Sequence, residues 1–394
     1  MNPGRLAALR VLIAVEEGAH AEELLPSIAP PQGPDRGLAW HISLGTLRYR
    51  GRIDNTIAPL LSRPLHKLDP GVRNALRIGV FEAHTSRTPP HAAVSQAVEA
   101  CRAVGLGRAT GMVNAVLRKA IKAHLSEDPF DDLPQWLRQR WQAHGEWVGR
   151  LHEPTPICVA STDPPTPESA PAMLAGEPIS NLWILPIGSG SVSSLSAYKE
   201  GKAWVMDPSA AKVADIVLDA IGTQGTVLDA CSAPGGKTMR MTSQGLKVTA
   251  AELSDSRIER LEENLERLSM DVPTIQHDWL NGPAPGLGTF DAVLVDAPCT
   301  GLGTIRRHPE IIWRRLPADP QAMGIRQRQI LTSAASHVRP GGVLVYAVCS
   351  PEPEEGIDVV QSFSGWEVVS QWCSVPPDGD EDAFQCFVMR QVEV

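Results

Sequence analysis

The chain has 394 residues, 43% hydrophobic and 21% charged, with seven cysteines and a formal net charge of −9 at pH 7. This length predicts two or three domains, and this composition is typical of a soluble globular protein. No apolar run reaches the ~18 residues that a membrane-spanning helix needs. No secretory signal is recognisable, and an odd number of cysteines without a CxxC pair is not typical of a disulfide framework or a structural zinc site. We therefore expect a cytoplasmic protein with reduced thiols, no metal and no membrane contact.

Residues 1–125 carry the spacing of amphipathic helices. The segments 5–18, 37–61, 71–84 and 91–105 place apolar residues at i, i+3, i+4 and i+7. This part holds 16 Lys and Arg against nine Asp and Glu, a net charge of +7, which leaves −16 for the rest. The pattern predicts a helical bundle whose basic surface either binds a polyanion or is simply solvated.

Residues 126–200 are rich in proline and predict a connector with a short helix near residues 133–147, followed by a small subdomain. From residue 201 to the end, short apolar strands alternate with helices, which predicts a parallel α/β sheet that binds ligands at the carboxyl ends of its strands. The predicted strands are Thr226–Ala230, Lys247–Glu252, Phe290–Val295 and Gly342–Ala347, and the predicted helices are Ser209–Ile221, Lys237–Gln244, Ser254–Leu268 and Pro320–His337.

The first of these strands runs into VLDACSAPGGKT, residues 227–238. A glycine-rich turn between a strand and a helix lets the backbone approach a ligand, but this one is neither the GxGxxG of dinucleotide-binding proteins nor a P-loop. Glu252 ends the next strand and is suited to accept hydrogen bonds from ribose hydroxyls, although a lone acid there is often only a helix cap. Asp278 follows a further apolar segment and is a weaker candidate for contact with an adenine.

Two cysteines follow predicted strands of the same sheet. FDAVLVDAPCTGLG brings Asp296 and Cys299 to one strand end, and GGVLVYAVCS brings Cys349 to another. A single cysteine in such a place is more often inert core, but two at the same sheet edge favour a reactive pair. The basic cluster Arg306, Arg307 and His308 comes next after the first cysteine and is suited to phosphate contact.

These motifs resemble a known family. DACSAPGGKT, DAPCTGLG, IRRHPEIIW and YAVCS are similar to the signature motifs of the RsmB/Sun (Fmu) group of RNA 5-methylcytosine methyltransferases. GTLRYRGRIDNTIAPLL, LDPGVRNALRIGVFEAH and MVNAVLRKAI are similar to the NusB-like RNA-binding domain of that group. The resemblance implies an all-α NusB-like bundle over residues 1–125, a connector and small subdomain over residues 126–200, and a Rossmann-like methyltransferase domain over residues 201–394.

The resemblance also implies roles for individual residues. Cys349 is the nucleophile, Cys299 assists release of the product, and Asp296 contributes to catalysis. S-adenosyl-L-methionine is the implied cofactor, and the residues implied to hold it are Cys231, Ser232, Ala233, Pro234, Gly235, Gly236, Lys237, Glu252, Asp278 and Asp296. The expected substrate is RNA, specifically 16S ribosomal RNA of the small subunit, and we expect the protein to be a monomer.

Three alternatives remain at this point. The substrate could be transfer RNA, or the chain could be a non-catalytic RNA-binding or ribosome-assembly factor on the same fold. The intact set Asp296, Cys299 and Cys349 argues against the second, because a factor without activity need not keep all three. An amino-group methyltransferase would carry a [DN]PP[YFW] motif, where this chain has Asp-Ala-Pro-Cys.

Overall fold

In the computed structural model, the chain forms two compact units. The first comprises Met1–Pro154 together with Ile305–Arg315, and the second comprises Thr155–Thr304 and Leu316–Val394. The structure describes residues 2–162, 182–185 and 191–392, apart from 376, 378 and 380. The boundaries predicted at residues 125 and 200 remain predictions, and the prolines predicted to favour turns at positions 164–178 lie outside the described residues.

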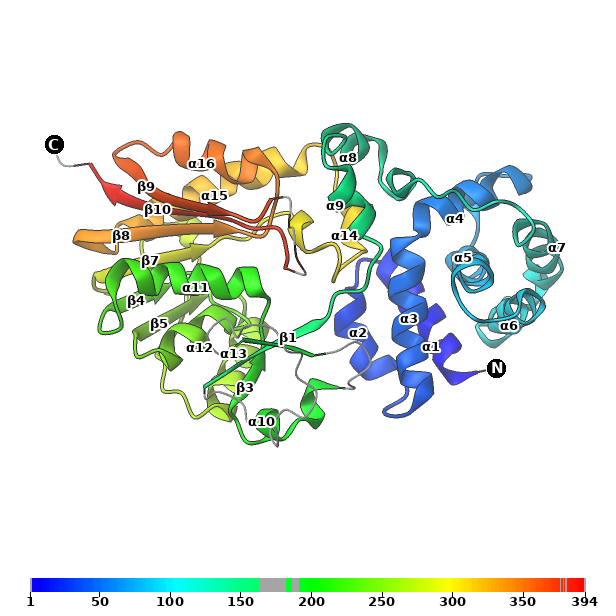
Figure 1. Ribbon diagram of the computed structural model, residues 1–394, viewed down its shortest axis with the longest axis horizontal. Coiled ribbons are helices and arrows are strands. Elements are labelled where there is room, and N and C mark those ends of the chain that lie inside the picture. The colour runs from blue at the N-terminus through cyan, green and yellow to red at the C-terminus, as the bar shows by residue number, and fades with distance from the viewer. Residues whose placement is uncertain are drawn as a thin grey trace. The chain divides into compact units, whose positions relative to one another are not determined.

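The first unit is built from helices (Figure 1). They are α1 (Pro3–Glu16), α2 (Ala21–Ile28), α3 (Pro34–Arg48), α4 (Arg50–Ile57), α5 (Pro70–Thr85), α6 (Pro90–Ala103), α7 (Thr110–Ala120), α8 (Gln135–Arg140), α9 (Gly145–Arg150) and α14 (Ile311–Arg314). Short 3-10 turns join them at η1 (Ala58–Leu60), η2 (Leu65–Lys67), η3 (Gly107–Ala109) and η4 (Pro129–Asp132). The prediction of a helical N-terminal bundle is confirmed.

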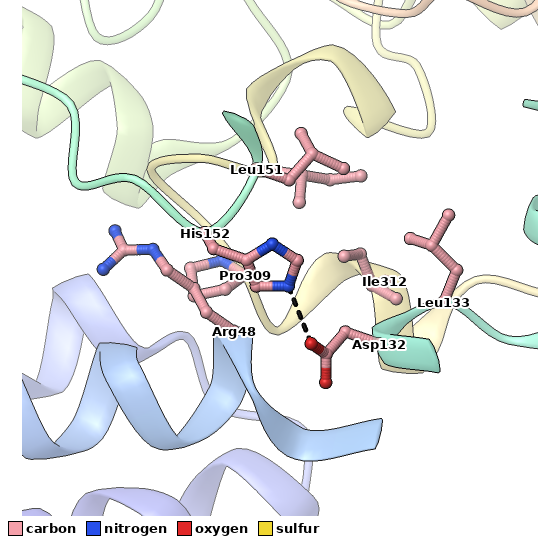
Figure 2. Close-up of a pocket in the computed structure, with 8 residues that line it drawn as sticks. Arg48, Asp132, Leu133, Leu151, His152, Pro309 and Ile312 are labelled. Carbon is pink, nitrogen blue, oxygen red and sulfur yellow. Dashed lines mark hydrogen bonds and ion pairs between the residues drawn. The ribbon is translucent and has the colours of Figure 1, made fainter. Parts of the chain in front are cut away.

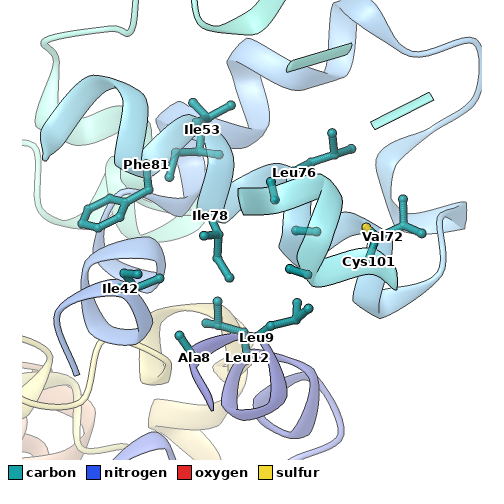
Figure 3. Packing of buried hydrophobic residues seen from close by; sticks show 14 of the residues in the cluster. Ala8, Leu9, Leu12, Ile42, Ile53, Val72, Leu76, Ile78, Phe81 and Cys101 are labelled. Carbon is teal, nitrogen blue, oxygen red and sulfur yellow. The ribbon is translucent and has the colours of Figure 1, made fainter. Parts of the chain in front are cut away.

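Helix α5 lies at the centre of this bundle and contacts α1, α3, α6 and α7. It begins where the Asp69 carboxylate accepts a hydrogen bond from the Gly71 N–H and Pro70 occupies the first turn, both favourable at a helix start. Figure 3 shows its buried side chains facing those of the neighbouring helices, with Phe81 toward α3. Gly45 of α3 permits this approach, because a Cβ atom there would lie 2.1 Å from the Phe81 ring.

Some of the arginines that give residues 1–125 their net positive charge form ion pairs inside this unit. The Arg77 guanidinium lies 2.7 Å from Asp54 and 2.5 Å from Glu16, and the Arg52 guanidinium lies 2.5 Å from Asp132. These arginines are buried, so they are not available to a polyanion. The cations that are exposed are Arg10, Arg63, Lys67, Arg87, Arg102, Arg108, Arg118, Lys119 and Lys122.

The second unit contains two sheets. A three-stranded antiparallel sheet has the order β2-β1-β3, and a seven-stranded sheet has the order β6-β5-β4-β7-β8-β10-β9. The strands are β1 (Ile157–Ser161), β2 (Leu182–Leu185), β3 (Ala203–Val205), β4 (Thr226–Asp229), β5 (Lys247–Glu252), β6 (Thr274–Gln276), β7 (Phe290–Asp296), β8 (Val338–Val348), β9 (Trp366–Cys373) and β10 (Gln385–Gln391). The helices are α10 (Ser196–Lys199), α11 (Pro208–Ile221), α12 (Gly236–Ser243), α13 (Asp255–Arg267), α15 (Asp319–Ala335) and α16 (Ile357–Gln361), with the 3-10 turns η5 (Val192–Ser194), η6 (Trp279–Asn281), η7 (Leu302–Thr304) and η8 (Pro353–Glu355).

Helices cover both faces of the large sheet (Figure 1). Alternate residues of β4, such as Val227 and Leu228, belong to different hydrophobic clusters on the two faces. The cluster on one face includes residues of α11, α12 and α13, and the cluster on the other includes residues of α15 and α16. The predicted α/β domain is thus confirmed as a layered structure with helices on both sides of its sheet.

The predicted strands and helices of this unit correspond to β4, β5, β7 and β8 and to α11, α12, α13 and α15. The last predicted strand begins earlier than expected, at Val338. Strands β10 and β9, which pair antiparallel with β8 and with each other, were not predicted. No helix among the described residues is long and apolar enough to cross a membrane.

Candidate active site

The carboxyl ends of β4, β7 and β8 lie side by side in the large sheet. Strand β7 pairs in parallel with β4 on one side and with β8 on the other. The chain fills the sheet outward from β4 through β5 to β6, and then returns to place β7 on the other side of β4. Such a reversal of strand order leaves a crevice at the carboxyl ends of the strands, which is where ligands bind in open α/β sheets.

A cavity of about 170 Å³ lies at this point. It is lined by Val205, Met206, Asp207, Ala210, Asp229, Cys231, Ser232, Ala233, Pro234, Gly236, Lys237 and Asp296. Six of these residues, Cys231, Ser232, Ala233, Pro234, Gly236 and Lys237, belong to the predicted glycine-rich loop. The structure therefore brings this loop and Asp296 together around one cavity, as the sequence predicts.

The conformation of the loop depends on Gly235, which precedes α12. Its φ of 106° lies in the left-handed region that side chains other than that of glycine rarely adopt. A Cβ atom at this position would also lie 2.6 Å from the Leu261 Cδ1 atom of α13. The Ser232 N–H and hydroxyl both donate to the Ala251 carbonyl of β5 at 3.0 Å, which holds the loop against the neighbouring strand.

Asp229, at the end of β4, is a cavity residue that sequence reasoning did not single out. Its Oδ2 accepts a 2.6 Å hydrogen bond from the Thr238 hydroxyl, whereas its buried Oδ1 has no hydrogen-bond partner among the described residues. Burial raises the pKa of this carboxyl to about 6, although the Thr238 hydrogen bond opposes the rise. The signal in the sequence was an acid directly before the glycine-rich turn, in the motif LDACSAPGG.

Lys237 and Asp296 form an ion pair beside the cavity. The Lys237 Nζ atom lies 2.5 Å from Asp296 Oδ2, and the two side chains are 11% and 26% exposed. Burial lowers the pKa of Lys237, but the Asp296 carboxylate outweighs burial, so the pKa is raised and the lysine stays cationic. Cys349 also acts on this ammonium electrostatically, which places Lys237 near the thiol.

The two predicted cysteines meet at the ends of β7 and β8. Cys299 Sγ lies 3.2 Å from Cys349 Sγ, and both side chains are partly exposed. The hydrogen bond with Cys349 and burial raise the pKa of the Cys299 thiol well above its usual value. A raised pKa means that Cys299 holds its proton tightly, while either sulfur atom can be the donor of the hydrogen bond between the two.

The remaining predicted cofactor residues lie nearby on β5 and beyond β6. Glu252 accepts hydrogen bonds at Oε1 from the N–H groups of Leu253 and Ser254, at 2.9 and 3.2 Å. Together with Asp229 and Asp296 it acts electrostatically on Cys231, whose pKa is raised well above its usual value, chiefly by burial. Asp278 caps η6 through a 3.0 Å bond from the Leu280 N–H, and neither Glu252 nor Asp278 lines the cavity. Their contact with the cofactor remains a prediction.

The predicted phosphate-binding cluster belongs to the helical unit. Arg306 is 3% exposed; its carbonyl accepts a 2.7 Å hydrogen bond from Arg48, and its guanidinium lies 3.9 Å from Glu153. Figure 2 shows Pro309 and Ile312 of this segment beside Asp132 and His152, around a cavity of about 10 Å³, the size of one water molecule. The nearby Glu310, a residue of the same motif, is fully buried and accepts from the Ala21 N–H at 3.1 Å.

The surroundings of Arg306 show a packing role for the first residue of the cluster. His308 is more exposed, and its Nδ1 lies 3.6 Å from Glu22. RNA contact by Arg306, Arg307 and His308 remains a prediction, and the burial of Arg306 does not favour it.

Comparison with known proteins supports the motif analysis. Residues 216–386 match the family described as 16S rRNA methyltransferase RsmB/F, and residues 2–122 match the NusB family. Ribosomal RNA small subunit methyltransferase B of Shewanella oneidensis is 31% identical over 92% of this chain and 90% of its own length. The protein of the same name from Pseudomonas syringae pv. tomato is 33% identical over 92% of this chain and 86% of its own.

The chain belongs to the RsmB/F methyltransferase family. A putative methyltransferase of Mycobacterium tuberculosis is also 32% identical, over 91% of this chain and 86% of its own length. Among solved structures, that of PH0851 matches with a TM-score of 0.83 at 21% identity over 99% of both chains. A methyltransferase homologue from Pyrococcus horikoshii matches with a TM-score of 0.54 at 22% identity over 68% of this chain and all of its own. Both structures agree with the fold.

Among the described residues, no group of three or more His, Cys, Asp or Glu side chains is arranged to hold a metal ion. The reactive groups that the structure places together in this RsmB/F family member are its thiol pair and its Lys237–Asp296 pair.

Proposed function

We propose that this protein is an S-adenosyl-L-methionine-dependent RNA methyltransferase that forms 5-methylcytosine in the 16S RNA of the small ribosomal subunit. The observation that carries the proposal is the 3.2 Å contact between Cys299 Sγ and Cys349 Sγ, with Lys237 and Asp296 next to it. A pair of thiols beside a cation is the arrangement that nucleophilic catalysis by a thiolate requires.

The cavity fits the methyl donor. The buried Asp229 Oδ1, which has no partner among the described residues, is an acceptor for the ammonium group of the donor's methionine part. Glu252 Oε1 is engaged by two backbone N–H groups, and no hydrogen bond to its Oε2 is found among the described residues, so Oε2 is suited to the ribose hydroxyls. The first turn of α12 points free N–H groups toward the loop. When bound, the donor supplies an electrophilic methyl group.

Cys349 would start the reaction because C5 of cytosine is too weak a nucleophile to take a methyl group directly. Its thiolate adds to C6, forming a C6–S bond, and the electrons of the C5–C6 double bond raise the electron density at C5. The ring takes a proton at N3 from the Lys237 ammonium, which donates a 2.5 Å hydrogen bond to Asp296. The target base must first leave its stack to reach the sheet edge.

Cys299 would complete the reaction. The largest cause of its raised pKa is the hydrogen bond with Cys349. Once the Cys349 sulfur is bonded to C6 it no longer carries a negative charge, so the pKa of Cys299 falls and its thiol gives its proton to water. The Cys299 thiolate then takes the proton from the methylated C5, and the C5–C6 double bond forms again. Cys349 leaves C6 as a thiolate, and N3 returns its proton to Lys237.

The choice of RNA is supported by the relatives and by the helical unit. Two relatives, each of which aligns with 92% of this chain, carry the name ribosomal RNA small subunit methyltransferase B. The exposed cations at the end of α7, Arg118, Lys119 and Lys122, are suited to the sequence-independent contacts that phosphates make with a basic surface. A cytoplasmic location and a monomeric state remain part of the proposal.

Bisulfite sequencing of total RNA from cells with and without the protein tests the proposal. We expect one or more cytosines of 16S RNA to be protected from conversion only when the wild-type protein is present, and not with Cys349→Ala. Cys373→Ala, which removes an exposed thiol on β9, is the matched control and should behave as wild type. Protection of transfer RNA alone would reassign the substrate, and protection by Cys349→Ala would exclude the proposed nucleophile.

A further inference from the structure

Behind the two cysteines lies a buried carboxylate that the proposed reaction does not use. Glu355, in the turn η8 after β8, is 0% exposed. Its Oε1 accepts a 2.7 Å hydrogen bond from the Thr300 N–H and a 3.3 Å bond from the Gln327 amide of α15. Its Oε2 accepts from the Thr300 and Ser350 hydroxyls, both at 2.5 Å.

The partners of Glu355 are the residues that directly follow the two cysteines. Thr300 follows Cys299 beyond β7, and Ser350 follows Cys349 beyond β8. One carboxylate therefore joins two chain segments that are separated by 50 residues in the sequence. Because each segment carries one thiol, this carboxylate helps to hold the two sulfur atoms at their observed distance.

Further hydrogen bonds hold the carboxylate itself in place. The Gln327 amide also donates to the Pro298 carbonyl at 3.1 Å, just before Cys299. The Tyr346 hydroxyl of β8 donates to the Glu355 carbonyl at 2.5 Å, and the Gln385 amide of β10 donates to the Ser350 and Glu352 carbonyls. The cluster is thus anchored by α15, β8 and β10, which are regular elements of the fold.

Within the described part of the chain, the hydrogen-bond donors to the Glu355 carboxylate are neutral groups: a backbone N–H, two hydroxyls and an amide. Burial raises the pKa of this carboxyl and these hydrogen bonds oppose the rise. Its negative charge acts on Cys299 and contributes to the raised pKa of that thiol, after the contributions of Cys349 and burial. A buried carboxylate without a cationic partner is costly to maintain, and a purely structural tie between the loops would not need the charge.

We propose that Glu355 is a positioning residue that clamps the chain behind both cysteines and reserves the thiolate for Cys349. The inference rests on the proposed function, because it assigns different duties to the two thiols. The clamp keeps the sulfur atoms in contact, and the charge keeps the proton on Cys299 until Cys349 has bonded to the base.

Glu355→Gln is the direct test, because it keeps the size of the side chain and removes the charge and one acceptor. We expect the rate constant for methyl transfer to fall at least about tenfold, since small displacements of reacting groups have effects of this size. The affinities for RNA and for S-adenosyl-L-methionine should change less than about twofold. Asp358→Asn, which neutralises an exposed carboxylate three residues away on α16, is the matched control and should leave all these values unchanged.

The readout that separates a positioning role from a structural one is the pH dependence of thiol alkylation in the free protein. Iodoacetamide labelling of the full-length chain, quantified by peptide mass spectrometry, gives one profile for Cys299 and one for Cys349. In the wild type we expect Cys349 to react at lower pH than Cys299. In Glu355→Gln the profile of Cys299 should move to lower pH, and the two profiles should approach each other.

Thr300→Val and Ser350→Ala each remove one hydroxyl donor and provide a milder perturbation if Glu355→Gln does not fold. Each should shift the Cys299 alkylation profile to lower pH, but by less than Glu355→Gln does. The inference would be overturned if the alkylation profiles of the folded variants were unchanged and their methyl-transfer rates fell only in proportion to the amount of folded protein. If the wild type forms no 5-methylcytosine but the profiles still shift, the proposed function fails while the assignment of Glu355 to the thiol pair stands.

Discussion

Replacement of Asp229 by Asn should make the second unit more stable at neutral pH and weaken its binding of the methyl donor. Burial raises the pKa of Asp229 from 3.8 in the unfolded chain to about 6, against the Thr238 hydrogen bond. The native state therefore holds this proton more tightly than the unfolded chain does. Its contribution to the free energy of unfolding is fully present below about pH 3.8, is lost as the pH rises to about 6, and stays level above that.

The size of this effect follows from the difference in pKa. About two units correspond to about 3 kcal/mol, at about 1.4 kcal/mol per unit. Asparagine carries no titratable group, so the free energy of unfolding of Asp229→Asn minus that of the wild type should grow by about 3 kcal/mol between pH 3 and pH 7. All other titrating groups are common to both proteins and cancel in this difference.

Hydrogen exchange of the backbone amides of β4 and β7, measured at several pH values, reports the free energy of unfolding of the second unit. Asp271→Asn, an exposed carboxylate after α13, is the matched control and should differ from the wild type by the same amount at every pH. The affinity of Asp229→Asn for S-adenosyl-L-methionine should fall about tenfold, because a charged acceptor for its ammonium group is lost. A difference in stability that does not change with pH would refute the reasoning.

Three further variants test the site and the RNA surface. Lys237→Met removes the cation beside Cys349 and should lower the rate constant for methyl transfer, measured by tritium incorporation, by about 10²-fold. Its circular dichroism spectrum should match that of the wild type, and an unchanged rate would exclude Lys237 from the chemistry. Gly235→Ala should destabilise the second unit by about 1–2 kcal/mol and weaken donor binding in calorimetry, because Gly235 has a positive φ and lies close to Leu261. Donor binding as tight as that of the wild type would show that the loop tolerates a Cβ atom. Glutamine at Arg118, Lys119 and Lys122 together should weaken RNA binding and lower its logarithmic salt slope by up to about three, and an unchanged slope would place the RNA elsewhere.

Much of the second unit could be predicted from the sequence because its signals are local. Strands such as Lys247–Glu252 are short apolar runs, and the glycine-rich turn is marked by Gly235, whose positive φ suits glycine. Once the strands are assigned to a parallel sheet, their carboxyl ends share one edge, so Asp296, Cys299 and Cys349 had to approach each other. The distance of 3.2 Å between the thiols is beyond what such a pattern indicates.

Features that depend on distant parts of the chain were not predictable in this way. Strand β9 has most of its residues exposed, so it lacks an alternating apolar pattern, and its place in the sheet is set by pairing with β10. Arg306 was predicted to contact phosphate because it is cationic, but it is buried in the helical unit, where its carbonyl accepts a hydrogen bond from Arg48. Glu355 stands in an acidic stretch of sequence, which predicts a solvated surface, and only the folded chain shows the partners around its carboxylate.

Covalent trapping tests most directly whether Cys349 attacks the base and Cys299 releases the product. The wild type, Cys299→Ala, Cys349→Ala and the double variant are each incubated with 16S RNA and S-adenosyl-L-methionine, denatured, and resolved by gel electrophoresis. We predict a slowly migrating protein–RNA adduct with Cys299→Ala only, because Cys349 can attack C6 while the C5 proton cannot be removed and the C6–S bond therefore persists. An adduct that forms with Cys349→Ala, or one that is absent with Cys299→Ala although that variant still binds RNA, would contradict the account.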